Sequence, residues 1–92
     1  ERPLGALWRI DATGAVRQVD EAFTIPNGFA FARDGATLYV ADSPRRVVLA
    51  YALDAAREVR SRAVLIGPEA FGDAFPDGMA VDADDHLWVA CY

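Results

Sequence analysis

The stretch Pro26-Asn27-Gly28-Phe29-Ala30-Phe31 recurs 50 positions later as Pro76-Asp77-Gly78-Met79-Ala80-Val81. Each copy is followed by a turn and then by a second apolar run, Leu38-Tyr39-Val40-Ala41 in the first case and Leu87-Trp88-Val89-Ala90 in the second. A repeat of roughly 40–50 residues that carries about four short strands is typical of a β-propeller blade. The sequence therefore predicts a propeller built from such units.

The apolar runs have strand length and are separated by Gly, Pro and Asp, which predicts an all-β fold. Asp34-Gly35 lies between two runs and favours a hairpin, because Gly adopts a positive φ at no steric cost. Residues 52–63 contain good helix formers, but their apolar positions do not follow a helical period, so we expect a hairpin connection there. The expected strands are Leu4–Ile10, Val16–Val19, Gly28–Ala32, Thr37–Ala41, Val47–Leu53, Ala63–Ile66, Gly78–Val81 and Leu87–Cys91.

The phase of the repeat divides the chain into blades. The innermost strand of a blade comes first along the chain, so Gly28–Ala32 and Gly78–Val81 are predicted to line the channel. The chain then holds the second half of one blade (residues 4–20), one complete four-stranded blade (27–66) and the first half of another (77–92). We expect a fragment of a longer chain, prone to self-association through its open sheet edges. In the alternative, these residues are a complete gene product and three copies close one ring.

Composition excludes several classes of partner. The chain has 14 acidic and 9 basic residues and a net charge of −5, which argues against binding the phosphate backbone of a nucleic acid. No apolar run approaches the ~18 residues that a membrane span needs. The single cysteine, Cys91, allows no internal disulfide, and we expect it to be buried on its strand. We therefore expect a cytoplasmic protein that binds neither nucleic acid nor membrane.

Two side chains are candidate metal ligands. Asn27 is the only Asn of the chain, and Asp77 occupies the same place in the next repeat. Both are predicted at one mouth of the channel, where two side-chain oxygens could share a hard divalent cation. Pro-Asn-Gly and Pro-Asp-Gly are also ordinary turn sequences, and calcium takes about six to eight oxygen ligands. From spacing alone, a metal site and a pair of turn residues both remain open.

Several motifs resemble the regucalcin/gluconolactonase family, also called the senescence marker protein family. They are residues 26–31, 34–43 and 76–83, together with the tail Leu87-Trp88-Val89-Ala90-Cys91-Tyr92, which is similar to the regucalcin form. The resemblance extends from Gly5 to Tyr92 and keeps the order of the motifs. It implies a six-bladed propeller roughly three times as long as this chain.

The resemblance also implies a site and a chemistry. The family holds one divalent cation, and its ligands match Asn27, Asp77 and a Glu for which this chain has no counterpart. The implied reaction is the hydrolysis of a sugar lactone, with Asp77 as both metal ligand and general base. Calcium is the expected ion, while zinc, manganese and magnesium remain open.

Two other functions remain open at this point. In the first, the propeller is not an enzyme and binds calcium or a small ligand in the same channel. In the second, it is a scaffold that binds proteins through its rim, and Asn27 and Asp77 are only turn residues. Loss of function on replacing Asp77 would exclude the scaffold, and an activity assay would separate the binding protein from the enzyme.

Overall fold

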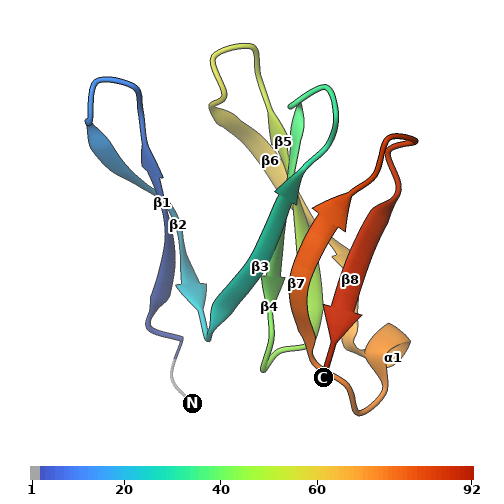
Figure 1. Ribbon diagram of the computed structural model, residues 1–92. Coiled ribbons are helices and arrows are strands. Elements are labelled where there is room, and N and C mark those ends of the chain that lie inside the picture. Colours follow the sequence, from blue (N-terminus) through green and yellow to red (C-terminus); the bar gives the residue numbers. More distant parts are fainter. Residues whose placement is uncertain (1–2) are drawn as a thin grey trace.

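The computed structural model describes residues 3–92, which form three antiparallel sheets. Three sheets stand side by side, and β3 of the middle sheet lies next to β7 (Figure 1). The first sheet pairs β1 (Gly5–Ile10) with β2 (Val16–Phe23), and the last pairs β7 (Pro76–Val81) with β8 (Leu87–Cys91). The middle sheet has four strands in chain order, which are β3 (Pro26–Phe31), β4 (Thr37–Asp42), β5 (Val47–Leu53) and β6 (Val59–Ile66).

One four-stranded sheet lies between two two-stranded sheets. The middle sheet contains every strand expected of a blade, and each flanking sheet contains two. The expected hairpin within residues 52–63 is also present, because β5 ends at Leu53 and β6 begins at Val59 with a turn between them. The architecture is therefore a set of partial propeller sheets.

The outer strands are longer than the sequence predicted. The strand β2 extends to Phe23 rather than ending at Val19, and β6 begins at Val59 rather than at Ala63. The added residues are mainly polar and exposed, for example Arg60-Ser61-Arg62 in β6. An outer strand faces solvent, so apolar patterning underestimates its length.

A short helix, α1 (Pro68–Phe71), connects β6 to β7 and was not predicted. Pro68 stands at its start, where the missing N–H of proline costs no helical hydrogen bond. Its four residues make a single turn. Across residues 3–92, no helix is long and apolar enough to cross a membrane.

Aspartates close the hairpin turns. Asp11, Asp54 and Asp82 each accept hydrogen bonds from backbone N–H groups two and four residues later. Asp82 also accepts from the indole Nε1 of Trp88 at 2.8 Å and faces Nδ1 of His86 at 3.0 Å. These donors, Trp88 first, hold the pKa of Asp82 far below its usual value. The carboxylate of Asp82 therefore stabilises its own hairpin turn.

We expect Trp88→Phe to raise the pKa of Asp82 toward its usual value, because the substitution removes the strongest hydrogen bond to the ionised carboxylate. A carboxyl NMR titration measures the change. Trp8→Phe is the matched control, since Trp8 makes no side-chain hydrogen bond within residues 3–92. An unchanged Asp82 titration in Trp88→Phe would show that the backbone donors alone set the pKa.

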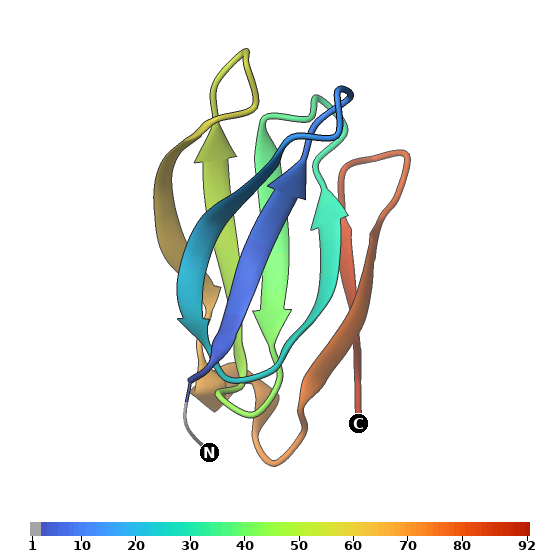
Figure 2. The same cartoon turned by 90° about the vertical axis from the view of Figure 1, so that its left-hand side faces the viewer.

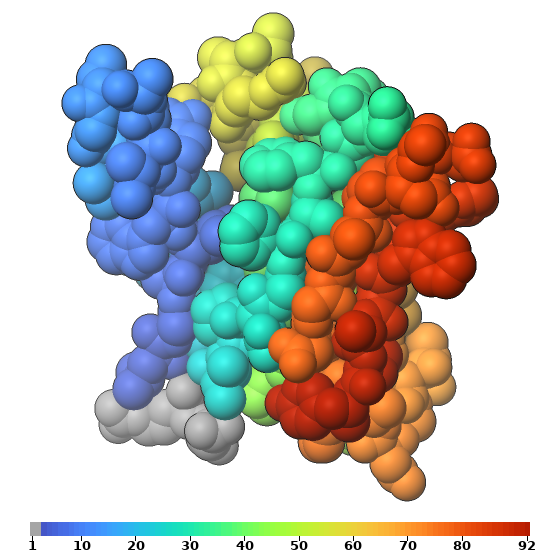
Figure 3. Space-filling view, in the orientation of Figure 1, coloured from blue at the N-terminus to red at the C-terminus, as the bar shows by residue number. Residues whose placement is uncertain are grey.

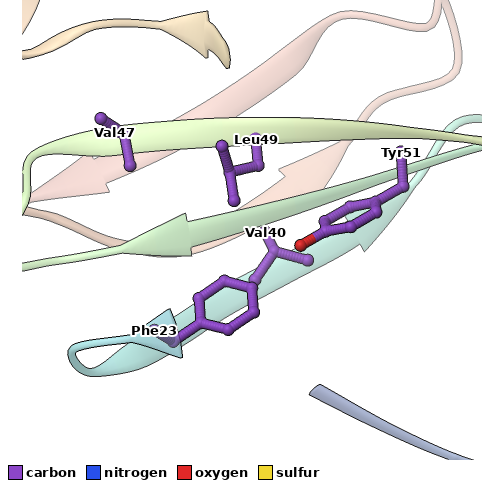
Figure 4. Close-up of a cluster of buried hydrophobic side chains, with 5 residues drawn as sticks. All are labelled: Phe23, Val40, Val47, Leu49 and Tyr51. Atoms are coloured by element: carbon purple, nitrogen blue, oxygen red, sulfur yellow. The ribbon is translucent and has the colours of Figure 1, made fainter. Parts of the chain in front are cut away.

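The core lies between the first two sheets. It consists of Phe23 from β2, Val40 from β4, and three residues of β5, namely Val47, Leu49 and Tyr51 (Figure 4). All five are at most 7% exposed. The core therefore joins the half sheet to the complete sheet, and β5 contributes most of it.

A polar network closes one edge of this core. The hydroxyl of Tyr51 donates to Asp20 Oδ2 at 2.7 Å, and Arg62 donates to the same oxygen at 2.7 Å. Burial acts to raise the pKa of Asp20, but the donors from Tyr51, Glu21 and Arg62 outweigh it and lower the pKa. Burial and the neighbouring Asp20 raise the pKa of Tyr51. Asp20 is therefore ionised and links β2 to β5 and β6.

Cys91 is exposed, so the expectation of a buried cysteine was wrong. It lies at the end of β8, which pairs with β7 on one side only. In the complete sheet the equivalent residue, Asp42, lies in β4 between two strands and is fully buried. The difference comes from the sheet edge and not from the cysteine itself.

Candidate metal site

The first strands of two neighbouring sheets meet at Gly28 and Asp77. A Cβ atom on Gly28 would overlap the carbonyl oxygen of Asp77 and lie 2.8 Å from the Cα of Gly78. The space-filling view shows the turquoise surface of β3 directly against the orange surface of β7 (Figure 3). Only glycine allows this approach at position 28. The contact places Asn27 and Asp77 at adjacent strand starts.

Ser43 ties these two strand starts together. The side chain of Asn27 donates through Nδ2 to Ser43 Oγ at 3.2 Å, and Ser43 Oγ in turn donates to the carbonyl oxygen of Pro76. Ser43 is fully buried. Oδ1 of Asn27 makes no hydrogen bond among the residues that the structure describes. The amide is therefore oriented and its oxygen is available as a ligand.

The two carboxylates near the strand starts have different roles. Asp42 is fully buried and accepts hydrogen bonds from the backbone N–H groups of Thr24 and Ile25, both at 2.9 Å. It closes the turn before β3. Asp77 is half-buried, and its carboxylate makes no hydrogen bond or ion pair within residues 3–92. Asp77 thus carries a free anionic ligand.

The donor set fits a hard divalent cation. One neutral amide oxygen and one carboxylate oxygen are ligands that calcium, magnesium and manganese accept. No group of three or more His, Cys, Asp or Glu side chains lies together within the described part of the chain. Asn27 and Asp77 are two candidate ligands, fewer than the six or so that calcium takes.

Sequence reasoning missed the bridging role of Ser43. The register explains its position. Asp42 pairs with Pro26 at the end of β4, so the next residue lies beside the start of β3. The position of this serine, directly after the second strand of a blade, is the sequence signal that could have predicted its role.

We expect Ser43→Ala to reduce the free energy of unfolding by about 1–3 kcal/mol, because it leaves the buried carbonyl of Pro76 without a donor. Urea denaturation measures the loss. Ser61→Ala is the matched control, since Ser61 is exposed on β6. Equal stability of the two variants would show that the Ser43 bridge contributes nothing.

An apolar hollow of the structure is separate from the candidate ligands. A groove of about 560 Å³ lies between the first half sheet and the complete sheet and is mostly apolar. Trp8, Phe29, Phe31 and Leu38 are among its lining residues, whereas Asn27 and Asp77 are not. Figure 3 shows this hollow between the blue β1–β2 hairpin and the turquoise β3.

Comparisons with known proteins agree with this fold. Residues 1–92 match the SMP-30/Gluconolactonase/LRE-like region. A pentonolactonase of Haloferax volcanii is 40% identical over 89 residues, which are 94% of this chain and 30% of that protein. The chain spans about a third of the length of the curated relatives it matches.

Two solved structures superimpose closely. The calcium-binding protein regucalcin from Agrobacterium tumefaciens gives a TM-score of 0.88 at 28% identity, over 100% of this chain and 31% of that one. A luciferin-regenerating enzyme gives 0.89 at 29% identity, over 98% of this chain and 30% of that one. The similarity to both covers nearly the whole chain.

Proposed function

The chain belongs to the SMP-30/gluconolactonase/LRE-like family, and on that basis we propose that it is part of a metal-dependent hydrolase of sugar lactones. The observation that carries the proposal is the backbone contact between two strand starts, one of which bears the amide of Asn27 and the other the carboxylate of Asp77. The pentonolactonase relative supports the substrate class. The activity would belong to a protein as long as the relatives, to which this chain would contribute two of the metal ligands.

Asn27 and Asp77 would hold the cation, which when bound polarises the lactone carbonyl and makes a water more acidic. Asp77 takes the proton of the attacking water on a carboxylate oxygen. The carbonyl carbon gains the hydroxyl group, the ring C–O bond breaks, and Asp77 returns the proton to the departing alcohol oxygen. Asn27 contributes a neutral ligand, so it adds no negative charge to that of the carboxylate of Asp77.

The proposal is tested by measuring lactone hydrolysis by a protein that contains this chain and is as long as its relatives. Gluconolactone turnover is expected to stop with a chelator and to return on addition of calcium, manganese, magnesium or zinc, with the preferred ion identified by the rate. Turnover that a chelator leaves unchanged would contradict the proposal.

A calcium-binding protein without turnover is the second candidate, because one of the matching structures is described as a calcium-binding protein. Calorimetry distinguishes the two functions. Metal binding that depends on Asp77, without hydrolysis of any lactone tested, would support binding over catalysis.

We expect the 92-residue chain alone to bind calcium weakly or not at all, since it provides two oxygen ligands. Calorimetric titration with calcium measures this, and the protein of family length is the positive control. Tight binding by the chain alone, lost in Asp77→Asn, would show that the remaining ligands come from within these residues or from water.

A further inference from the structure

Ser43 is enclosed at the end of the molecule where the two candidate ligands lie. The turn after β4 and the starts of β3 and β7 are all at this end of the sheets (Figures 1 and 2). The backbone N–H of Ser43 donates to the carbonyl oxygen of Ile25 at 3.2 Å, and its carbonyl oxygen accepts from the backbone N–H of Arg46 at 3.0 Å. Its side chain is fully buried. The hydroxyl group is therefore held in one place, between Asn27 and Pro76.

The carbonyl group of Pro76 uses the proton of this hydroxyl. Phe75 and Tyr92 exchange both of their backbone hydrogen bonds, at 2.7 and 3.0 Å. The next pair along the hairpin, Pro76 and Cys91, is therefore a non-hydrogen-bonded pair, whose carbonyl groups point away from the partner strand. The carbonyl of Pro76 points to Ser43 instead and accepts from its hydroxyl. Because a carbonyl oxygen only accepts, the single hydroxyl proton of Ser43 is used there.

This count of protons determines how the side-chain amide of Asn27 is turned. A serine hydroxyl has one proton to donate and two lone pairs with which to accept. Since its proton goes to Pro76, Ser43 Oγ can only accept from Asn27, across the 3.2 Å that separates it from Nδ2. The NH₂ group of the amide must then face Ser43, and Oδ1 faces away from it. A carboxylate at position 27 has no proton to donate, so two oxygens would face each other with no proton between them.

The two copies of the repeat differ at both of these positions. Asn27 aligns with Asp77 at an offset of 50, and Ser43 aligns with Tyr92 at an offset of 49. The hydroxyl of a tyrosine lies at the far end of an aromatic ring, so it cannot lie beside the backbone as the hydroxyl of Ser43 does. The copy that has the serine carries an amide, and the copy that lacks it carries a carboxylate.

We propose that Ser43 is a positioning residue that makes position 27 selective for a neutral amide over a carboxylate. Its hydroxyl accepts from the amide of Asn27 and opposes a carboxylate, because its own proton is used by Pro76. The consequence for a metal rests on the proposed function. The cation would receive one negative charge from Asn27 and Asp77 together instead of two, and the remaining charge of the ion is what polarises a lactone carbonyl.

Calorimetry with calcium gives the first test, in a protein that contains this chain and is as long as its relatives. We expect Asn27→Asp to bind calcium about tenfold more weakly, as when a residue that supports a metal ligand is disturbed. Attraction between charges alone predicts the opposite, because the substitution adds a negative charge. Gln18→Glu is the matched control, since it makes the same change at an exposed position of β2 and should leave binding unchanged. Equal or tighter binding of calcium by Asn27→Asp would overturn the proposal.

Removal of the serine hydroxyl should reverse the effect of Asn27→Asp. Ser43→Ala alone leaves the amide free to turn, and we expect calcium binding to weaken by about tenfold. In the double variant no serine oxygen opposes the carboxylate, so it should bind calcium more tightly than either single variant. If Ser43 only supported the fold, the double variant would be the weakest of the three, and that order would refute the selectivity.

Thermal unfolding in the presence of a chelator tests the same coupling without metal or substrate. Asn27→Asp should lower the unfolding midpoint when Ser43 is present and leave it nearly unchanged in the Ser43→Ala background. Ser61→Ala, at an exposed position of β6, is the matched control background, in which the full effect of Asn27→Asp should remain. Equal lowering of the midpoint in the Ser43→Ala and Ser61→Ala backgrounds would show that Ser43 does not discriminate between the two side chains.

The role of Ser43 and the proposed function fail in different experiments. If the unsubstituted protein neither binds a divalent cation nor hydrolyses a lactone, the proposed function is wrong, while the unfolding midpoints still measure the coupling between Ser43 and Asn27. If turnover depends on a metal and the midpoints show no coupling, only the role assigned to Ser43 is wrong.

Discussion

Asp77→Asn is expected to lower kcat for lactone hydrolysis by roughly 10³-fold in the protein of family length, because it removes the base that accepts the proton of water. The substitution keeps the shape of the side chain. It also leaves the backbone carbonyl of Asp77 against Gly28, so the contact between the sheets is preserved. The loss is therefore expected in the chemistry and not in the fold.

Asp73→Asn is the matched control for this experiment. Asp73 lies four residues earlier in an exposed position and undergoes the same change of charge. Its activity should stay within a factor of two or so of the parent, since surface substitutions have small effects. Calorimetry with calcium is the second readout, and binding should weaken only in Asp77→Asn. Full activity of Asp77→Asn would exclude Asp77 as the base and as a required ligand.

Gly28→Ala is expected to reduce the free energy of unfolding by about 3 kcal/mol, at the upper end of the usual effect of overpacking. The atom that the new Cβ would meet is a backbone carbonyl oxygen, which no side-chain rotation can move away. The strands β3 and β7 must separate, and the bridge from Asn27 through Ser43 to Pro76 then breaks. Lactonase activity should fall with stability, because the two candidate ligands move apart.

The control for Gly28→Ala is the same substitution at the equivalent position of the repeat. Gly78 has nothing within 4 Å in this structure, so Gly78→Ala should change the stability of the 92-residue chain by less than about 1 kcal/mol. Urea denaturation compares the two. Equal stability of both variants would show that the β3–β7 contact is looser than the structure describes.

Local patterns account for most of what could be predicted. The repeat of Pro26–Phe31 at Pro76–Val81 required no knowledge of distant contacts, and it identified the blade, its phase and the positions of Asn27 and Asp77. Asp34-Gly35 likewise marks a turn through its own backbone preference. Turn chemistry and strand alternation act over a few residues, so they can be read from a sequence.

Other features depend on what each residue packs against. The polar outer strand β6 extends to Val59 because it pairs with β5, not because its own residues favour a strand. Cys91 is exposed because β8 lies at an edge, although its neighbours in sequence are apolar. The length of β6 and the exposure of Cys91 follow from how the strands pair, which cannot be predicted from the sequence of one strand alone.

The sequence by itself determined the propeller unit and the two candidate ligands, because both follow from short motifs repeated along the chain. Only the tertiary structure decided that Gly28 touches the backbone of Asp77 and that Ser43 orients the amide of Asn27. Those contacts join residues 16 or more positions apart in the chain, and the contact of Gly28 with Asp77 joins two different sheets. Their geometry comes from the packing of one sheet against the next.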